Sequence, residues 1–218
     1  MRNLETGSAG PQPTRSVPDL FAEGQRYLMG NGILNNTLAE LAAKLKHHGI
    51  DYVVVGAIAL KEHGFYRVTD NIDLVLTAEG LAKFNREILG RGGYGIAGYD
   101  QAVPGSSRRL RSYPGGVSIQ IMTAGEYPGD GQPNPVSMPQ PSTASIEIDG
   151  INIVTFEKLI ELKLASGMTA PHRLKDLADV QELIKIRGLQ PEFAKRLDPY
   201  VREKFLELCE TIRQSPKD

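Results

Sequence analysis

The 218-residue sequence contains one cysteine, Cys209, and no tryptophan. A single cysteine excludes an internal disulfide and a cysteine-clustered zinc site, and it fits a reducing cytoplasm. The formal net charge is −1 and the pI is about 6.4, so the chain lacks the overall positive field of a dedicated nucleic-acid-binding protein. No apolar run approaches the roughly 18 residues that a membrane helix needs. We therefore expect a cytoplasmic protein with no membrane partner.

Hydrophobic residues make up 40% of the chain, which is enough for a sizeable core. Residues 1–18 are rich in Gly, Ser, Pro and Thr, as is typical of a disordered tail. Strand-like and helix-like segments are interspersed over residues 19–154, whereas residues 155–218 have helical patterns only. This order predicts an α+β fold: a mixed β-sheet core with flanking helices, and a C-terminal helical part packed on it.

The stretch 51–77, DYVVVGAIALKEHGFYRVTDNIDLVLT, has the clearest local signals. The β-branched run at 52–55 predicts a buried strand that Gly56 ends. A short helix is expected next, with Gly64 as its stop, before a second strand at 72–76. Upstream, apolar residues recur at helical spacing over 20–48, with Asn36 or Thr37 as a plausible N-cap and Gly49 as the stop, and they predict one helix that leads into the strand at 52.

Polar side chains stand at the start of the second strand. Asn71 and Asp73 are two positions apart, so they point to the same face. Asp70 points to the other face unless a bulge intervenes.

Three further segments have distinctive compositions. Residues 106–116, SSRRLRSYPGG, predict a polar turn whose basic cluster, Arg108, Arg109 and Arg111, either touches RNA or is simply solvated. Residues 125–141 contain five prolines and predict an ordered loop or a flap. Asp149-Gly150 predicts a hairpin turn between two short strands.

Four segments in sequence order carry a resemblance: VVVGAIAL at 53–60, RVTDNIDL at 67–74, VSIQIM at 117–122, and ELKLASGMTAPHRLKDLADVQEL at 161–183. They resemble the nucleotidyltransferase superfamily with the polymerase-β-like core. The likeness is closer to its AbiEii-like branch of small bacterial proteins, some of which are toxins of toxin–antitoxin pairs. The second segment matches an Arg-x-Thr-x-Asp-x-Asp pattern, and the fourth matches a helical Lys…Arg-x-Lys-Asp-x-x-Asp pattern.

The resemblance implies Mg²⁺-dependent transfer of NMP from an NTP to a hydroxyl of RNA or protein, with RNA or a small antitoxin protein as a further partner. That chemistry uses two Mg²⁺ ions held by three converging carboxylates. The register puts the three catalytic positions at Asn71, Asp73 and Gln120, so only one acid remains. Asp73 and Asn71 are the candidate metal ligands.

The same resemblance implies six nucleotide-binding residues: Gly56, Ala57, Arg67, Thr69, Lys163 and Lys175. The glycine turn would let backbone N–H groups approach the phosphates. Lys163 and Lys175 would face the triphosphate or the acceptor, with Asp179 orienting one of them.

Simpler interpretations of these charged residues stay open. Arg67 would otherwise pair on the surface with Asp70 or Glu62. Lys175 and its acidic neighbours would otherwise form a solvated helix face. His63 and His172 are isolated, and we interpret them as non-catalytic.

Two hypotheses follow from the substituted acids. The first is a degenerate nucleotidyltransferase with Asp73 as its surviving ligand. The second is a catalytically inactive member of the fold that binds a nucleotide, RNA or a partner protein. Fold alone does not decide between them, because function resides in the site.

Overall fold

The computed structural model describes residues 17–89, 94–98, 108–112 and 116–214. The predicted tail over residues 1–18 lies outside this part of the chain up to residue 16, and helix α1 begins at Val17. None of the described helices is both long enough and apolar enough to cross a bilayer.

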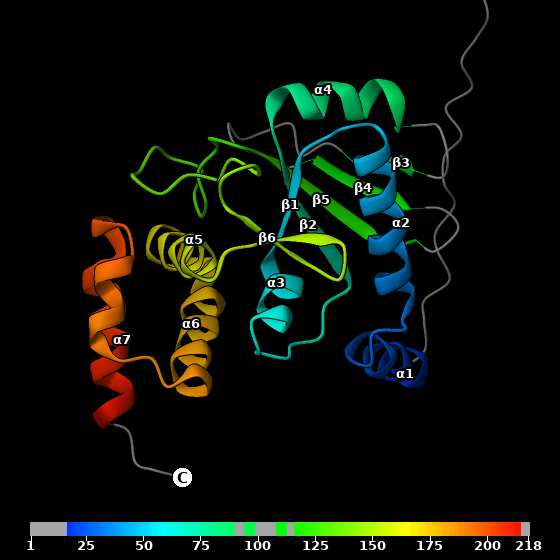
Figure 1. Ribbon diagram of the computed structural model, residues 1–218. Helices are drawn as coiled ribbons and strands as arrows, with labels where there is room; N and C mark the ends of the chain where they lie inside the picture. The colour runs from blue at the N-terminus through cyan, green and yellow to red at the C-terminus, as the bar shows by residue number, and fades with distance from the viewer. Residues whose placement is uncertain (1–16, 90–93, 99–107, 113–115, 215–218) are drawn as a thin grey trace, which may run out of the picture.

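Within the described residues, seven strands form one mixed sheet in the order β3-β4-β5-β2-β1-β7-β6 (Figure 1). The strands are β1 (Tyr52–Val55), β2 (Asn71–Leu76), β3 (Tyr94–Gly98), β4 (Arg108–Ser112), β5 (Ser118–Thr123), β6 (Ser145–Ile148) and β7 (Ile151–Val154). Strand β2 pairs antiparallel with β1 and parallel with β5, while β7 pairs parallel with β1. The predicted mixed α+β architecture is confirmed.

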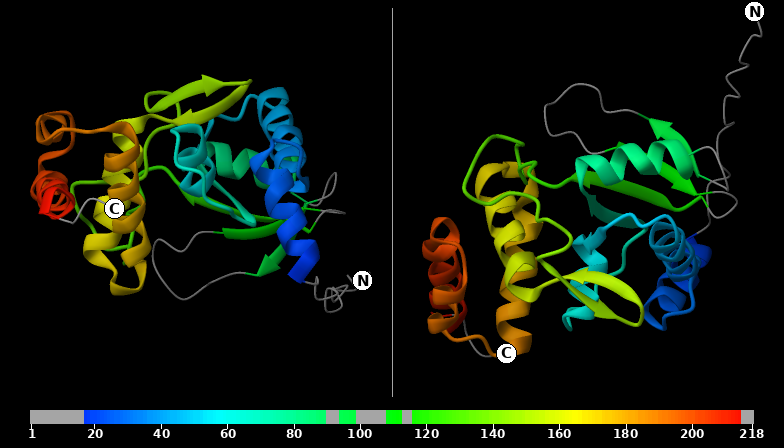
Figure 2. Two further views of the ribbon diagram at one scale, coloured as in Figure 1. Left: turned by 90° about the horizontal axis from the view of Figure 1, so that it is seen from below. Right: turned by 45° about the horizontal axis from the view of Figure 1, so that its top comes forward.

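The helices surround this sheet. They are α1 (Val17–Leu28), α2 (Ile33–His47), α3 (Gly56–Glu62), α4 (Ala78–Glu87), α5 (Phe156–Thr169), α6 (Leu174–Arg187) and α7 (Pro199–Gln214), with 3₁₀ turns η1 (Pro171–Arg173) and η2 (Pro191–Arg196). Figures 1 and 2 show α5, α6 and α7 grouped on one side of the molecule, with α1 and α2 on the opposite side. Helix α5 packs against α3, which in turn packs on β1, β2 and β7.

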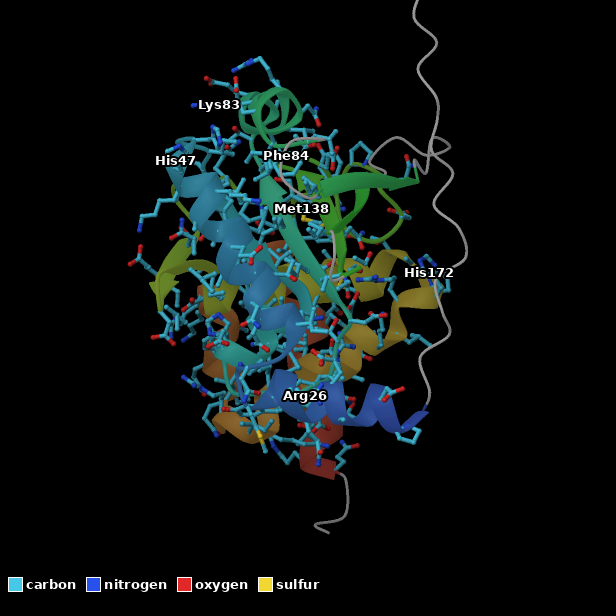
Figure 3. The ribbon with its side chains drawn as sticks, turned by 90° about the vertical axis from the view of Figure 1, so that its right-hand side faces the viewer. Arg26, His47, Lys83, Phe84, Met138 and His172 are labelled. Carbon is cyan, nitrogen blue, oxygen red and sulfur yellow. The ribbon has the colours of Figure 1, made fainter. Side chains whose placement is uncertain are left out.

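The core is built from the strands and the helix faces that cover them. Val53, Val54, Ile72 and Leu74 are fully buried, as their β-branched or aliphatic character predicts. Phe84, on α4, is also fully buried and points from the helix toward the sheet (Figure 3).

Two local predictions were wrong. Residues 20–48 form two helices, because Gly30 adopts φ +80°, which ends α1 in a conformation that glycine tolerates. Part of the predicted turn at 106–116 is strand β4, which pairs with both β3 and β5. Backbone pairing outweighs a polar sequence there, since a strand between two neighbours needs no apolar pattern to satisfy its N–H and C=O groups.

The proline-containing segment at 125–141 is an ordered loop that packs on α5. A Cβ on Gly129 would lie 2.0 Å from Thr169 Oγ1 and 3.0 Å from the carbonyl oxygen of Ser166. Val136 is fully buried in the core. The loop at 125–141 therefore packs closely against α5.

Candidate functional site

The first half of β2 lies between the end of β1 and the first half of β5. Asp73 pairs in register with Val55 on one side and with Gln120 on the other. Gly56 follows Val55 directly and packs against the Asp73 carboxyl group. The structure thus brings together positions that strand alternation and the family resemblance predicted, although their roles stay predictions. We call Gly56, Thr69, Asn71, Asp73 and Gln120 the Asp73 site.

A chain of hydrogen bonds runs along the start of β2. The Thr69 hydroxyl donates to Asn71 Oδ1 at 2.8 Å, and Asn71 Nδ2 donates to Asp73 Oδ1 at 2.6 Å. A carboxylate can only accept, so the amide must present its nitrogen to Asp73 and its oxygen to Thr69. Asn71 therefore offers Asp73 a donor, whereas a metal ligand would have to offer its oxygen.

Asp73 is partly buried, and this environment disfavours its charged form. Burial raises the pKa of Asp73 from the usual 3.8 to about 6. Lys163, Arg173, the Asn71 hydrogen bond and Lys175 act in the opposite direction. Cations from the C-terminal helices therefore contribute to the electric field at the start of β2.

Gly56 is required by this close packing. It adopts φ +68°, and a Cβ there would lie 2.1 Å from Asp73 Oδ2. Ala57, the next residue, is buried in α3. Helix α3 has only seven residues, so its N-terminus contributes a weak dipole. The absence of a side chain at Gly56 leaves room for the Asp73 carboxyl group.

The α5–α6 hairpin contains a buried ion network that faces this region. Lys163 Nζ lies 3.0 Å from Asp176 Oδ1 and 2.6 Å from Asp179 Oδ2, and all three side chains are at least nine-tenths buried. Burial alone would raise the pKa of Asp176, but Lys163, Arg173 and hydrogen bonds from Lys163 and Ser166 hold it below its usual value. Lys163 is thus held between two carboxylates.

Two members of this network were given no role from the sequence, although Arg173 is part of the helical pattern at 161–183. Arg173 Nε donates to Asp176 Oδ2 at 2.7 Å and to Ser166 Oγ at 3.1 Å. Ser166 Oγ donates in turn to Asp176 Oδ2 at 2.8 Å. The i,i+3 spacing of Arg173 and Asp176 is a usable helical signal. The involvement of Ser166 depends on how α5 meets α6, which no local pattern shows.

Arg67 links the network to the strand. Its Nη1 lies 3.6 Å from Asp179 Oδ2, so the surface pairings with Asp70 or Glu62 are not the ones observed. Its Nε is buried without a hydrogen-bond partner among the described residues. Asp179 therefore contacts two cations: Arg67, in the segment before β2, and Lys163 on α5.

The remaining candidates are more exposed. Lys175 lies in the first turn of α6, is exposed, and has no ion-pair partner in the described part of the chain. Asp70 is also exposed, and β2 pairs with β5 without a register shift from Asn71 onward, so no bulge turns Asp70 toward Asp73. His172 lies at the edge of the molecule, on η1 (Figure 3).

The donor set does not fit two Mg²⁺ ions. Among the described residues, no group of three or more His, Cys, Asp or Glu side chains could hold a metal ion. At the Asp73 site a single carboxylate remains, and Asn71 already occupies one of its oxygens. Mg²⁺ requires several hard oxygen ligands in a near-octahedral arrangement.

Comparison with solved structures identifies the architecture. A crystal structure of ANT(2″)-Ia in complex with adenylyl-2″-tobramycin has a TM-score of 0.52 and 13% sequence identity, covering 79% of this chain and 96% of that chain. A solution structure of the antibiotic-resistance factor ANT(2″)-Ia has a TM-score of 0.50 and 15% identity, covering 82% and 97%. The chain has the nucleotidyltransferase fold. At these identities the likeness concerns the fold alone.

Sequence comparisons add no closer relative. No protein-family model matches the chain, and no curated protein matches it. The nucleotidyltransferase fold is the one that the resemblance of the four sequence segments implies.

Proposed function

We propose that this nucleotidyltransferase-fold protein binds a nucleoside triphosphate beside Asp73 and transfers NMP from it weakly or not at all. The hydrogen bond from Asn71 Nδ2 to Asp73 Oδ1 carries the proposal. It places a neutral donor where two-metal transfer needs an anionic oxygen ligand. Gln120, in register with Asp73 on β5, is a second neutral group at that level of the sheet.

Triphosphate binding is supported by the cations near Asp73. Lys175 is exposed and Arg173 is partly exposed, and both lower the pKa of Asp73. Their N–H groups can donate charge-assisted hydrogen bonds to phosphate oxygens. Lys163 is less suited to this role, because it is buried between two carboxylates.

The finer predictions rest on the sequence resemblance. They comprise membership of the AbiEii-like branch, a requirement for Mg²⁺, transfer to an RNA or protein hydroxyl, and a toxin role with an antitoxin partner. The proposed binding function needs none of them.

The test is calorimetric titration of ATP, CTP, GTP and UTP, each with Mg²⁺ and with EDTA, into the natural protein and its variants. Lys175→Gln should weaken binding about tenfold, the size expected for one charge-assisted hydrogen bond. Lys185→Gln removes the same charge from the exposed far end of α6 and should leave binding unchanged. Equal affinity for all three proteins would contradict the proposed position of the phosphates.

A repair variant tests the state of the catalytic positions. Asn71→Asp combined with Gln120→Asp restores three acids, so triphosphate binding should become strongly dependent on Mg²⁺. Transfer of labelled NMP, to the protein itself and to bulk RNA, is measured in parallel. Strong Asp73-dependent transfer by the unmodified protein would overturn the proposal of a weakened site.

A further inference from the structure

A pocket of about 470 Å³ lies at the other end of α3 from the Asp73 site. Helix α3 begins at Gly56 beside Asp73 and is capped by His63, which lines the pocket. Helix α5 begins in the pocket at Phe156, whereas Lys163 lies farther along it, toward the Asp73 site. Helix α6 packs against α5, and Arg187 at the end of α6 lines the pocket. The pocket and the Asp73 site thus lie at opposite ends of α3 and share no residue.

Aromatic rings and guanidinium groups form part of the wall. The Phe156 and Phe193 rings pack edge to face with centroids 5.7 Å apart. Arg187 lies over Phe156 at 5.4 Å, and Arg196 lies over Phe193 at 5.0 Å. Planar guanidinium groups and phenyl rings both stack on a flat ligand ring. The wall therefore suits a planar aromatic body.

The charges in the pocket favour an anion. Arg196 pairs with Glu157, whereas Arg187 has no carboxylate partner among the described residues. One net positive charge remains. The first turn of α5 adds to it, because this 14-residue helix begins in the pocket with no side-chain cap on its free N–H groups.

His63 supplies an acceptor. It is more than nine-tenths buried, and its Nε2 donates to the carbonyl oxygen of Val154 at 2.7 Å. Burial lowers the pKa of His63 and Arg187 acts in the same direction, against the hydrogen bond to Val154 and the nearby Glu157 and Glu62. The proton on Nε2 leaves Nδ1 as an acceptor, and Nδ1 has no partner in the described part of the chain.

We propose that this pocket binds a small planar aromatic molecule that carries one anionic group and a ring-bound N–H donor. The anion would contact Arg187, the ring would stack on the Phe156–Phe193 wall, and the donor would reach His63 Nδ1. An amino-substituted aromatic carboxylate and a nucleoside monophosphate with an amino-substituted base both carry such a ring, an anionic group and an N–H donor. The proposal is independent of nucleotide binding beside Asp73.

The test is a titration followed by ¹H–¹⁵N correlation spectroscopy on the full chain. The ring-bearing anions are 4-aminobenzoate and AMP, which represent the two sources. Acetate provides the anion without the ring, and aniline provides the ring without the anion. Either ring-bearing anion should shift the amide signals of residues 155–157 and 187–189, with acetate and aniline binding at least about tenfold more weakly. Shifts at residues 69–73 would report the Asp73 site separately.

Arg187→Gln should weaken binding of the ring-bearing anion about tenfold, because it removes one charge-assisted hydrogen bond. Lys185→Gln, two residues away and outside the pocket, is the matched control and should leave binding unchanged. Both residues are exposed, so both variants should keep the melting temperature of the natural protein. Three results would each overturn the proposal: no shift at the pocket up to about 10 mM, acetate binding as tightly as 4-aminobenzoate, or equal weakening by the two variants.

Discussion

Asn71 Nδ2 and Asp73 Oδ1 lie 2.6 Å apart on the same face of β2, with the amide as donor. Thr69 fixes the orientation of that amide by donating to its oxygen. This hydrogen bond and the nearby cations Lys163, Arg173 and Lys175 favour the charged form of Asp73, although burial outweighs them. A carboxylate at position 71 would instead bring two negative charges together and would need a cation between them.

The first prediction concerns the pH dependence of stability. The pKa of Asp73 rises from 3.8 to about 6 on folding. Between these pH values the folded state holds a proton that the unfolded chain has lost, so the free energy of unfolding falls as pH rises through this window. Above about pH 6 the cost is complete, on the order of 3 kcal/mol.

Asp73→Asn removes this cost while keeping an acceptor for Asn71. The variant should match the natural protein near pH 4 and exceed it by about 2–3 kcal/mol near pH 7.5, as measured by urea unfolding. Asp70→Asn, on the exposed neighbour, is the control and should show no such pH-dependent gain. A constant difference for Asp73→Asn at both pH values would show that burial does not disfavour its charged form.

The second prediction concerns the ion network. Lys163→Met leaves two buried carboxylates, Asp176 and Asp179, without their shared cation. The free energy of unfolding should fall by about 3–5 kcal/mol, because each buried carboxylate then keeps only one partly exposed arginine, Arg173 or Arg67. Lys185→Met disrupts an exposed pair with Glu182 and should cost less than about 1 kcal/mol. Adding Asp176→Asn and Asp179→Asn should recover part of the loss, and failure to recover any would contradict the charge argument.

The third prediction separates the two reasons for glycine at position 56. Gly56→Ala must accept both φ +68° and a Cβ 2.1 Å from Asp73 Oδ2. We expect a loss of more than about 2 kcal/mol in the natural background, but only about 1 kcal/mol in an Asp73→Ala background, where the backbone strain and a 3.1 Å approach to the Cβ at position 73 remain. Thermal or urea unfolding of the four proteins gives the coupling energy. Strictly additive losses would mean that Asp73 moves aside without cost.

The sequence predicted the elements whose signals are local. The β-branched runs at β1 and β2, the period-two spacing of Asn71 and Asp73, and the Asp149-Gly150 hairpin all appear where the pattern indicated. Strand β4 was missed, because pairing with strands on both sides decides its structure. Gly30 was missed as a break, because one positive φ outweighed an otherwise continuous helical pattern.

The positions of the candidate-site residues could be predicted from the sequence better than their hydrogen bonds and ion pairs. Period-two spacing and the family resemblance together placed Asp73 beside Gln120, and β2 and β5 pair in that register. The donor role of Asn71 could not be predicted, because it depends on which way an amide turns toward Thr69. The pairing of Arg67 with Asp179 also escaped prediction, because it joins segments that meet only when α6 packs on the core.

Strand β7 beside β1 has a consequence for how the chain folds. The backbone N–H of Asn152 donates to the Tyr52 hydroxyl at a sequence separation of 100 residues, and Val54 pairs with Ile153. The hairpin of β6 and β7 can form early, yet its parallel docking must wait until a long loop has closed, and such non-local pairings slow folding. Until β7 docks, β1 presents an unpaired edge. An unpaired strand edge can pair with another chain, so the time before β7 docks is a period of aggregation risk.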